Sequence, residues 1–484
     1  MRTLNRKNVV LIVLAIVLLI VCIVGGIYMV RINEDNSETE PTVEEIVSGR
    51  LNAYNTDLLD SLNSFTSNEA VANYLVNWGK HKQIKAVKDE YNNVIFTIKA
   101  AEGYEDAAPV AILCGYDASD MESYVDSLST ALTIAKSGIN NGRYTVIFSP
   151  EENRHEAELT TLPDSYFTDD TELFYLGHIS ESKVASVTGG YREYRLSKKL
   201  KYEKPDYNKA YKISIKNLPG GTFGSKINQQ PNAIKTLGNL IANFKSTSLL
   251  FELSSFRGGD KASAIPASAS MTIVINGTDT AKFQTKMENA ITKFYDKYQD
   301  AYPEIEYTYE EVDLPSKVIT KVKTDNIVSL MYTAFNGVYS KDDDGNVSAV
   351  NNIGRISTRD GKLIIDIASM SSSQELLDEI SETYQTISGL CSVNFKCRID
   401  YPIFDGGEKS RLFMDKFEID FKEFTGDDSM KVTENLEATP CTLLAEKNSS
   451  MSILYCGVTG KTAQKFAGSI ITYLDNELHQ EAEK

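Results

Sequence analysis

The sequence predicts an α/β protein whose helix-covered core sheet is interrupted by an inserted α+β domain and preceded by one transmembrane helix. Three observations lead to this prediction. A long apolar run stands near the N-terminus, short buried strands alternate with helices over residues 94–148, and alternating strands with amphipathic helices follow residue 204. Strands alternating with helices are typical of a parallel sheet, whereas helices packed on antiparallel strands are typical of an α+β layer.

The apolar run covers residues 9–30 and contains neither a charged residue nor a proline. As a helix it is about 33 Å long, which matches the hydrocarbon core of a bilayer. Basic residues precede it and an acidic linker, residues 31–43, follows it. The positive-inside rule therefore predicts a single-pass plasma-membrane protein with residues 1–8 in the cytoplasm and the bulk of the chain extracellular. A cleaved signal peptide is the competing interpretation, although its apolar region is expected to span only about 7–15 residues.

Composition narrows the classes of function. The 484 residues suffice for two or three domains with a substantial core. A net charge of −17 argues against nucleic-acid binding, because an acidic surface repels phosphate backbones. Six cysteines do not make a disulfide scaffold, and the sequence leaves open whether Cys441 and Cys456 pair.

The clearest helix of the core lies in "FTSNEAVANYLVNWGK", residues 65–80. Thr66 and Glu69 have the spacing of a capping box, and Gly79 is the expected stop. Apolar residues recur at helical spacing along one stripe, which includes Trp78, the only tryptophan. We therefore expect Trp78 to pack in the core.

The strands and the remaining helices define the domain boundaries. Strands are expected at residues 94–98, 110–114 and 144–148, with a helix between the last two. The C-terminal segment, residues 402–484, is too short to fold alone and is expected to complete the core begun by residues 44–203. Residues 204–401, in which two helices on antiparallel strands are repeated, then form an inserted lid of ferredoxin-like character.

Acidic residues stand where two of these strands end. Asp117 follows one strand in "ILCGYDASD", and Glu151 and Glu152 follow another in "SPEEN". Ligands of open parallel sheets bind at the carboxyl ends of strands, and carboxylates gathered there suit a hydrolytic metal site. The alternative is structural: Asp117 caps the next helix, and a lysine, an arginine or a hydroxyl lies beside the glutamates to relieve their repulsion.

Several motifs, in order, resemble those of a known family. They are "VNWGKHKQIKAVKDEYNNVIFTIK", "PVAILCGYD", "SPEEN", "VTGGYREYRL", "KNLPGGTFGSKI" and "SSFRGGDKASAIP". The chain is similar to the dinuclear zinc peptidase family that contains carboxypeptidase G and acetylornithine deacetylase, and most similar to its aminoacyl-histidine dipeptidase branch. The resemblance covers residue 50 to the end, and it implies a peptidase-like core with an inserted lid that often mediates dimers.

The resemblance also assigns roles to residues. Glu151 matches the general base, Glu152 a metal ligand, and Asp117 the aspartate that orients a histidine ligand. The histidine itself is replaced by Gly115. Other positions of the family's site carry different residues: Ser123 with Asp126 off register for the bridging aspartate, Gly177 or His178 for a further aspartate ligand, Thr222 for the lid histidine, Ser263 for the lid asparagine and Ser369 for the lid arginine.

This coordinated loss predicts a membrane-anchored, catalytically inactive homologue of aminoacyl-histidine dipeptidase that acts as a binding or scaffolding protein. No cofactor is expected, and a peptide or protein ligand would occupy the cleft between core and lid. The alternative is an active metal-dependent dipeptidase or amidohydrolase with an altered zinc site, rebuilt from Glu152, His155 and His178. A third interpretation is a purely structural subunit of a membrane complex with a filled cleft.

Overall fold

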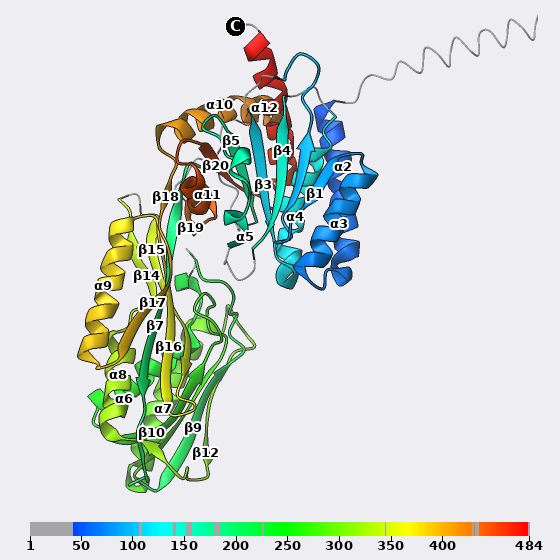
Figure 1. Ribbon diagram of the computed structural model, residues 1–484. Coiled ribbons are helices and arrows are strands. Elements are labelled where there is room, and N and C mark those ends of the chain that lie inside the picture. The colour runs from blue at the N-terminus through cyan, green and yellow to red at the C-terminus, as the bar shows by residue number, and fades with distance from the viewer. Residues whose placement is uncertain are drawn as a thin grey trace, which may run out of the picture.

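The computed structural model describes residues 42–105, 109–138, 142–151, 157–178, 184–224, 227–343, 345–427, 430 and 435–482. These residues form two lobes, a core and a lid, placed end to end (Figure 1). No helix in these ranges has the length and apolar character that crossing a membrane requires. The predicted membrane helix, Glu152 and His155 lie outside the described residues.

The core is built on a seven-stranded sheet. Its strands are, in spatial order, β1 (Lys85–Lys88), β2 (Val94–Ile98), β4 (Tyr144–Pro150), β3 (Val110–Tyr116), β5 (Glu172–Gly177), β20 (Ser452–Gly457) and β6 (Val184–Ala185). The four strands β4, β3, β5 and β20 run parallel to one another. Because β20 pairs with β5, the C-terminal part of the chain completes the core sheet.

Helices cover both faces of this sheet. On one face lie α2 (Val43–Ser61), α3 (Asn68–His81), α4 (Met121–Ala135), α10 (Gly407–Thr425) and α12 (Ala463–Ala482). On the other face lie the short helices α5 (Ala157–Thr160) and α11 (Cys441–Lys447). The strands are buried on both sides, as their nearly continuous apolar sequences require.

The helix predicted within residues 65–80 is α3, and it differs from expectation at both ends. The N-cap of α3 is Ser67, whose hydroxyl accepts from the Ala70 backbone N–H at 3.2 Å, so the predicted cap at Thr66 is wrong by one residue. The helix also continues past Gly79 to His81, because Gly79 is used for close packing: a Cβ there would lie 3.0 Å from Phe96. Trp78 stacks on the same phenylalanine and is buried, as predicted.

The lid is built on one long antiparallel sheet. Its main path is β12 (Glu306–Val312), β9 (Lys209–Lys216), β11 (Ala269–Ile275), β10 (Phe251–Gly258), β15 (Val347–Ser357), β16 (Lys362–Ser371), β7 (Val187–Lys199) and β17 (Asn394–Tyr401). Short strands extend it or lie beside it: β8 (Tyr202–Glu203), β13 (Val318–Ile319), β14 (Gly337–Lys341), β18 (Phe404–Asp405) and β19 (Asn435–Ala438). The long strand β7 enters the lid sheet before residue 204.

Four helices accompany the lid sheet: α6 (Ala233–Ser246), α7 (Thr280–Tyr298), α8 (Lys321–Thr333) and α9 (Gln374–Leu390). They pack with one face of the sheet in a single apolar cluster. The sheet consists of two four-stranded halves, joined where β10 and β15 share only two residue pairs, Arg257 with Ser357 and Gly258 with Ile356. Each half has helices on the same side, which matches the repeated α+β pattern read from the sequence.

Candidate functional site

The carboxyl ends of the parallel core strands meet at one edge of the sheet. Tyr116 at the end of β3 is in register with Pro150 at the end of β4, and the Glu151 N–H donates to the Tyr116 carbonyl at 2.8 Å. On the neighbouring strands, Gly177 is in register with Gly457. This alignment places Asp117, Glu151 and His178 on the same rim, where the sequence predicts the site.

Glu151 is buried at this rim and its carboxylate is held by two phenols. Only 7% of the residue is exposed. The Tyr124 hydroxyl of α4 donates to Oε2 at 3.2 Å, and the Tyr175 hydroxyl of β5 donates to Oε1. Tyr124 packs with the helices on one face of the sheet, and Tyr175 packs on the opposite face. The carboxylate therefore accepts hydrogen bonds from both sides of the sheet.

His178 completes this cluster. Its Nδ1 lies 4.0 Å from Glu151 Oε2, and its ring lies against the Tyr124 ring with the centroids 3.8 Å apart. Burial raises the pKa of Tyr124, and the charges of Glu151 and Asp117 raise it further. Tyr124 therefore keeps its proton at neutral pH and remains a hydrogen-bond donor to the carboxylate.

The glycine at position 115 provides the space that Glu151 occupies. A Cβ built on Gly115 would lie 2.5 Å from Glu151 Oε2 and closer still to Oε1. No side chain at position 115 fits while Glu151 keeps this position. The resemblance places a histidine metal ligand at this residue, and no histidine fits here while the glutamate keeps its inward position.

The space beside a second glycine on the rim is also occupied by a neighbouring side chain. A Cβ on Gly177 would lie 2.7 Å from the Tyr455 hydroxyl of the neighbouring strand β20, and closer to the ring. The resemblance places an acidic metal ligand at or next to this position. The Glu151 carboxylate therefore occupies the space beside Gly115, and the Tyr455 side chain occupies the space beside Gly177.

Asp117 has the role of a cap. Its carboxylate accepts from both the backbone N–H and the hydroxyl of Ser119, each at 2.8 Å, and so caps the 3-10 turn η2 (Ala118–Asp120) that leads into α4. The two candidates for the bridging aspartate have other partners. Ser123 is exposed and donates to Asp120 at 3.0 Å, while Asp126 accepts from Asn55 of α2 at 3.1 Å.

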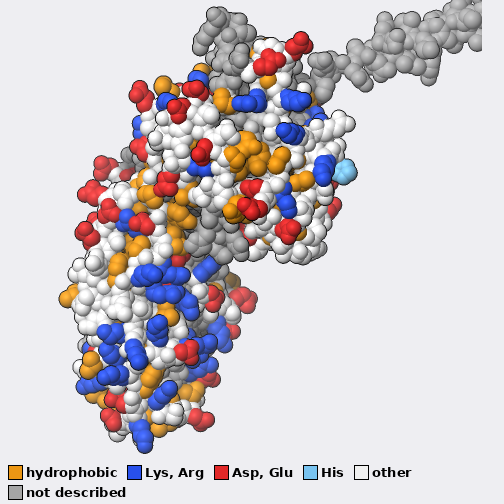
Figure 2. Space-filling model, viewed as in Figure 1, with side chains coloured by type: hydrophobic (Ala, Val, Ile, Leu, Met, Phe, Trp, Pro, Cys, Tyr) orange, Lys and Arg blue, Asp and Glu red, His pale blue; other side chains and the backbone are white. Residues whose placement is uncertain are grey.

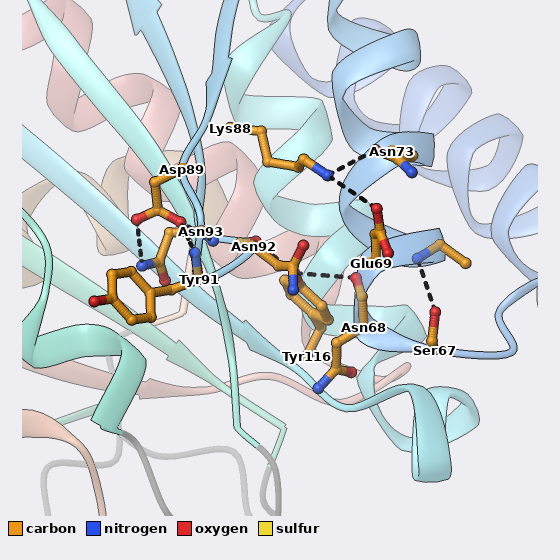
Figure 3. Close-up of polar contacts among 11 residues, drawn as sticks. Ser67, Asn68, Glu69, Asn73, Lys88, Asp89, Tyr91, Asn92, Asn93 and Tyr116 are labelled. Carbon is orange, nitrogen blue, oxygen red and sulfur yellow. Dashed lines mark hydrogen bonds and ion pairs between the residues drawn. The ribbon is translucent and has the colours of Figure 1, made fainter.

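Polar contacts beneath the rim hold the ends of β3 and β4 in place. The Tyr116 hydroxyl, drawn in Figure 3, donates to the Asn92 carbonyl at 2.6 Å. The Asn68 side chain at the start of α3 accepts from the Ala118 N–H at 2.9 Å. Ser149 donates to the Asn93 side chain at 2.7 Å. The backbone that carries Asp117 and Glu151 is thus fixed to the start of α3 and to the loop that precedes β2.

The lid positions named by the resemblance are brought together in part. Thr222 forms a β-bridge with Ala264, and the Phe223 N–H donates to the Ser263 carbonyl at 3.2 Å, so these two turns are adjacent. Thr222 is exposed and Ser263 is partly exposed. Ser369, by contrast, is fully buried and donates to Asn351 at 2.7 Å inside the lid. It is a structural residue of the lid interior.

Within the described residues, no group of three or more His, Cys, Asp or Glu side chains is arranged to hold a metal ion. The sequence analysis missed Tyr124 and Tyr175 as members of the site. Both lie on apolar stretches and look like ordinary core aromatics in sequence. The general expectation that a hydroxyl lies beside the glutamates is the signal that pointed to them.

The two-lobed arrangement, with a parallel core sheet and an inserted lid, defines the fold class. No protein-family model matches the sequence, and no curated protein matches it. Among solved structures, the chain is similar to aminoacylhistidine dipeptidase from Vibrio alginolyticus, with a TM-score of 0.66 and 18% identity over 91% of this chain and 99% of that one. The chain therefore has the fold of that dipeptidase over nearly its whole length.

More distant similarities are to aminopeptidase PepT from Bacillus cereus and to a dinuclear metal-binding peptidase from Bacillus subtilis. The first has a TM-score of 0.42 and 8% identity over 89% of this chain and 98% of that one. The second has a TM-score of 0.37 and 12% identity over 88% of this chain and 99% of that one.

Proposed function

We propose that this chain is a homologue of the dinuclear zinc peptidases that no longer hydrolyses peptides and acts as a binding or scaffolding protein. The observation that carries the proposal is the position of Glu151. This residue matches the general base of the family, yet its carboxylate is buried, accepts from Tyr124 and Tyr175, and fills the space of a side chain at position 115.

The surroundings of Glu151 and the two glycines on the rim explain why this arrangement is unsuited to hydrolysis. A general base must lie within hydrogen-bond reach of the water that it activates. Both oxygens of Glu151 instead accept hydrogen bonds from phenols, which occupy positions that an activated water would need. A two-metal site also needs ligands fixed around ions that are about 3.5–4 Å apart, and Gly115 and Gly177 supply no ligand.

The proposed setting is the outer face of a membrane. Residues 9–30 are long and apolar enough to anchor the chain, with the core and lid outside. The ligand would be a peptide or a protein segment held between core and lid. The adjacent lid turns at Thr222 and Ser263 offer polar groups for this purpose, although neither supplies the histidine or asparagine of the active family.

Purified full-length protein, incubated with zinc or manganese and a library of dipeptides, tests the proposal. We expect no turnover above that of a Glu151→Gln variant, which serves as the matched control. Metal-dependent turnover by the native chain that disappears in Glu151→Gln would refute the inactive assignment.

One observation favours a second candidate, an active hydrolase with an altered metal site. His178 Nδ1 lies 4.0 Å from Glu151 Oε2, so a histidine and a carboxylate do meet on the rim. A metal held by His178, Glu152 and His155 would supply a Lewis acid there. This candidate predicts zinc-dependent turnover that is lost in His178→Ala, whereas His81→Ala, a change far along the chain on α3, leaves it intact.

A further inference from the structure

One face of the lid sheet is open in part, since apolar clusters around Met370 and around Val318 cover other parts of the same face. The helices α6, α8 and α9 lie along the other face (Figure 1). On β9, Tyr211, Ile213 and Ile215 belong to the apolar cluster beneath these helices, so the alternate residues Lys212 and Lys216 lie on the open side. Basic side chains are concentrated on the lid in Figure 2, although the chain as a whole carries a net charge of −17.

The open face contains a hollow of about 940 Å³, formed by β9, β10, β11 and β15. The charged residues among those that line it are five cations, Lys212, Lys216, Arg257, Arg355 and Arg359, and one acid, Asp260. The local charge is thus opposite in sign to that of the whole protein. A concentration of one sign in a concave surface raises the local concentration of ligands of the opposite sign.

Two of these cations are available to a ligand. Arg257 and Arg359 are exposed, and neither forms an ion pair with any residue that the structure describes. Lys212 and Lys216 lie 3.6 and 3.9 Å from the exposed Glu310 and Glu306 on β12. Such exposed pairs are weak and are readily exchanged for a ligand.

Hydroxyl groups lie between the cations. Arg257 is in register with Ser270 on one side and Ser357 on the other, and Ser270 is in register with Ser214. This row crosses four strands, which at about 4.8 Å per strand spans roughly 15 Å. Guanidinium forks combined with hydroxyl donors suit phosphate, whose several oxygens accept from several directions. The span is long enough for more than one phosphate.

The lining also argues against other anionic partners. None of the described residues that line the hollow is aromatic, so bases of a single-stranded nucleic acid would find no stacking platform among them. A hollow along the sheet suits a linear chain, whereas a bilayer presents a planar surface.

We propose that the open face of the lid binds a linear phosphodiester polymer without aromatic bases, with Arg257 and Arg359 as the principal phosphate contacts. This site lies in the lid and does not depend on whether the core hydrolyses peptides. Binding is electrostatic in origin, and the affinity therefore falls as salt concentration rises.

The test is binding of a fluorescently labelled glycerol-phosphate oligomer to the full-length protein, measured by anisotropy over a range of salt concentrations. We expect binding at low salt that weakens at least tenfold in Arg257→Glu/Arg359→Glu. The slope of log affinity against log salt should also fall by about two, since roughly one unit is lost for each phosphate contact removed.

Two further variants control this result. Lys286→Glu/Lys293→Glu makes the same change in net charge on α7, a helix that packs on the covered face, and is expected to bind as the native chain does. Arg257→Lys/Arg359→Lys keeps the charge but not the guanidinium fork, and is expected to keep the salt slope while binding more weakly.

Several outcomes would overturn the proposal. One is absence of binding, and another is an equal loss in the α7 control. Equal affinity for polyglutamate of the same charge would exclude a preference for phosphate. Tighter binding of single-stranded DNA would point to a nucleic-acid site, and binding of anionic phosphatidylglycerol vesicles but not of the oligomer would point to a membrane surface.

Discussion

Charged residues on the rim of the core sheet and on the open face of the lid sheet differ in burial and in pairing. Glu151 on the rim is buried, and both of its oxygens accept from tyrosines. Arg257 on the lid is exposed, and it has no ion-pair partner among the described residues. A charge satisfied within the protein has little left to offer a ligand, whereas an exposed, unpaired charge is ready to bind one. The exposed cations of the lid are therefore better placed to bind a ligand than the buried carboxylate of the rim.

The largest expected effect comes from restoring the histidine at position 115. In Gly115→His the new side chain needs the space of the Glu151 carboxylate, which must leave its two phenols or strain the rim. We expect the free energy of unfolding to fall by about 3 kcal/mol, from overpacking and lost hydrogen bonds together. Urea denaturation measures this, and zinc is expected not to restore the loss.

A double-mutant cycle isolates the steric cause. Gly115→Ala alone is expected to cost about 2 kcal/mol, because it displaces the carboxylate from Tyr124 and Tyr175. In a Glu151→Ala background the same change should cost almost nothing, since the obstructing atoms are gone. Costs that add within about 0.5 kcal/mol would show that the two residues do not compete for space.

The next largest effect is expected from the buried ion pairs of the lid. Asp366 is buried, and Arg195 donates to both of its oxygens at 2.6 and 2.9 Å, while Arg355 and Arg398 lie within 4.0 Å. Asp366→Asn removes the only negative charge of this group and should lower the unfolding free energy by about 2 kcal/mol. Arg257→Gln, a change at an exposed and unpaired cation, is the matched control and should stay within about 0.5 kcal/mol.

Thermal and urea unfolding of both variants provide the measurement. If Arg257→Gln destabilises the protein as much as Asp366→Asn, Arg257 is an internal structural residue, and the contrast between rim and lid fails.

The smallest effect concerns alkaline pH. The pKa of Tyr124 is raised in the folded state by burial and by Glu151, so above pH 10 the unfolded chain loses this proton first. The stabilisation is fully present below the unfolded pKa and is lost as the pH rises from that value through the folded pKa. Between about pH 9 and 11, Tyr124→Phe should lose roughly 1 kcal/mol less stability than the native chain. Equal pH slopes for the two proteins would show that Tyr124 does not hold its proton against the carboxylate.

The sequence predicted the architecture because its apolar patterns are local and strong. The predicted strands that became β2, β3 and β4 are almost entirely apolar, and α4 carries a wide buried face. The cap of α3 was misplaced by one residue, since Thr66 and Ser67 are equally good caps in sequence and only the backbone of the turn chooses between them.

The arrangement of the side chains on the rim could be predicted from the sequence only in part. Gly115 could be recognised as an absent ligand, but the use of its space by Glu151 depends on how two neighbouring strands are paired. Tyr124 and Tyr175 come from opposite faces of the sheet and meet only in the folded chain. The open face of the lid escaped prediction for the same reason: its cations are spread over separate strands within an acidic sequence.

We propose that Glu151 and its tyrosines occupy the place of the family's metal site, and metal content tests this proposal most directly. The full-length protein is loaded with zinc, dialysed extensively and analysed by elemental mass spectrometry beside the Glu151→Gln variant. The account predicts far less than stoichiometric zinc in both. Near-stoichiometric zinc that survives dialysis in the native protein and is lost in Glu151→Gln would contradict it.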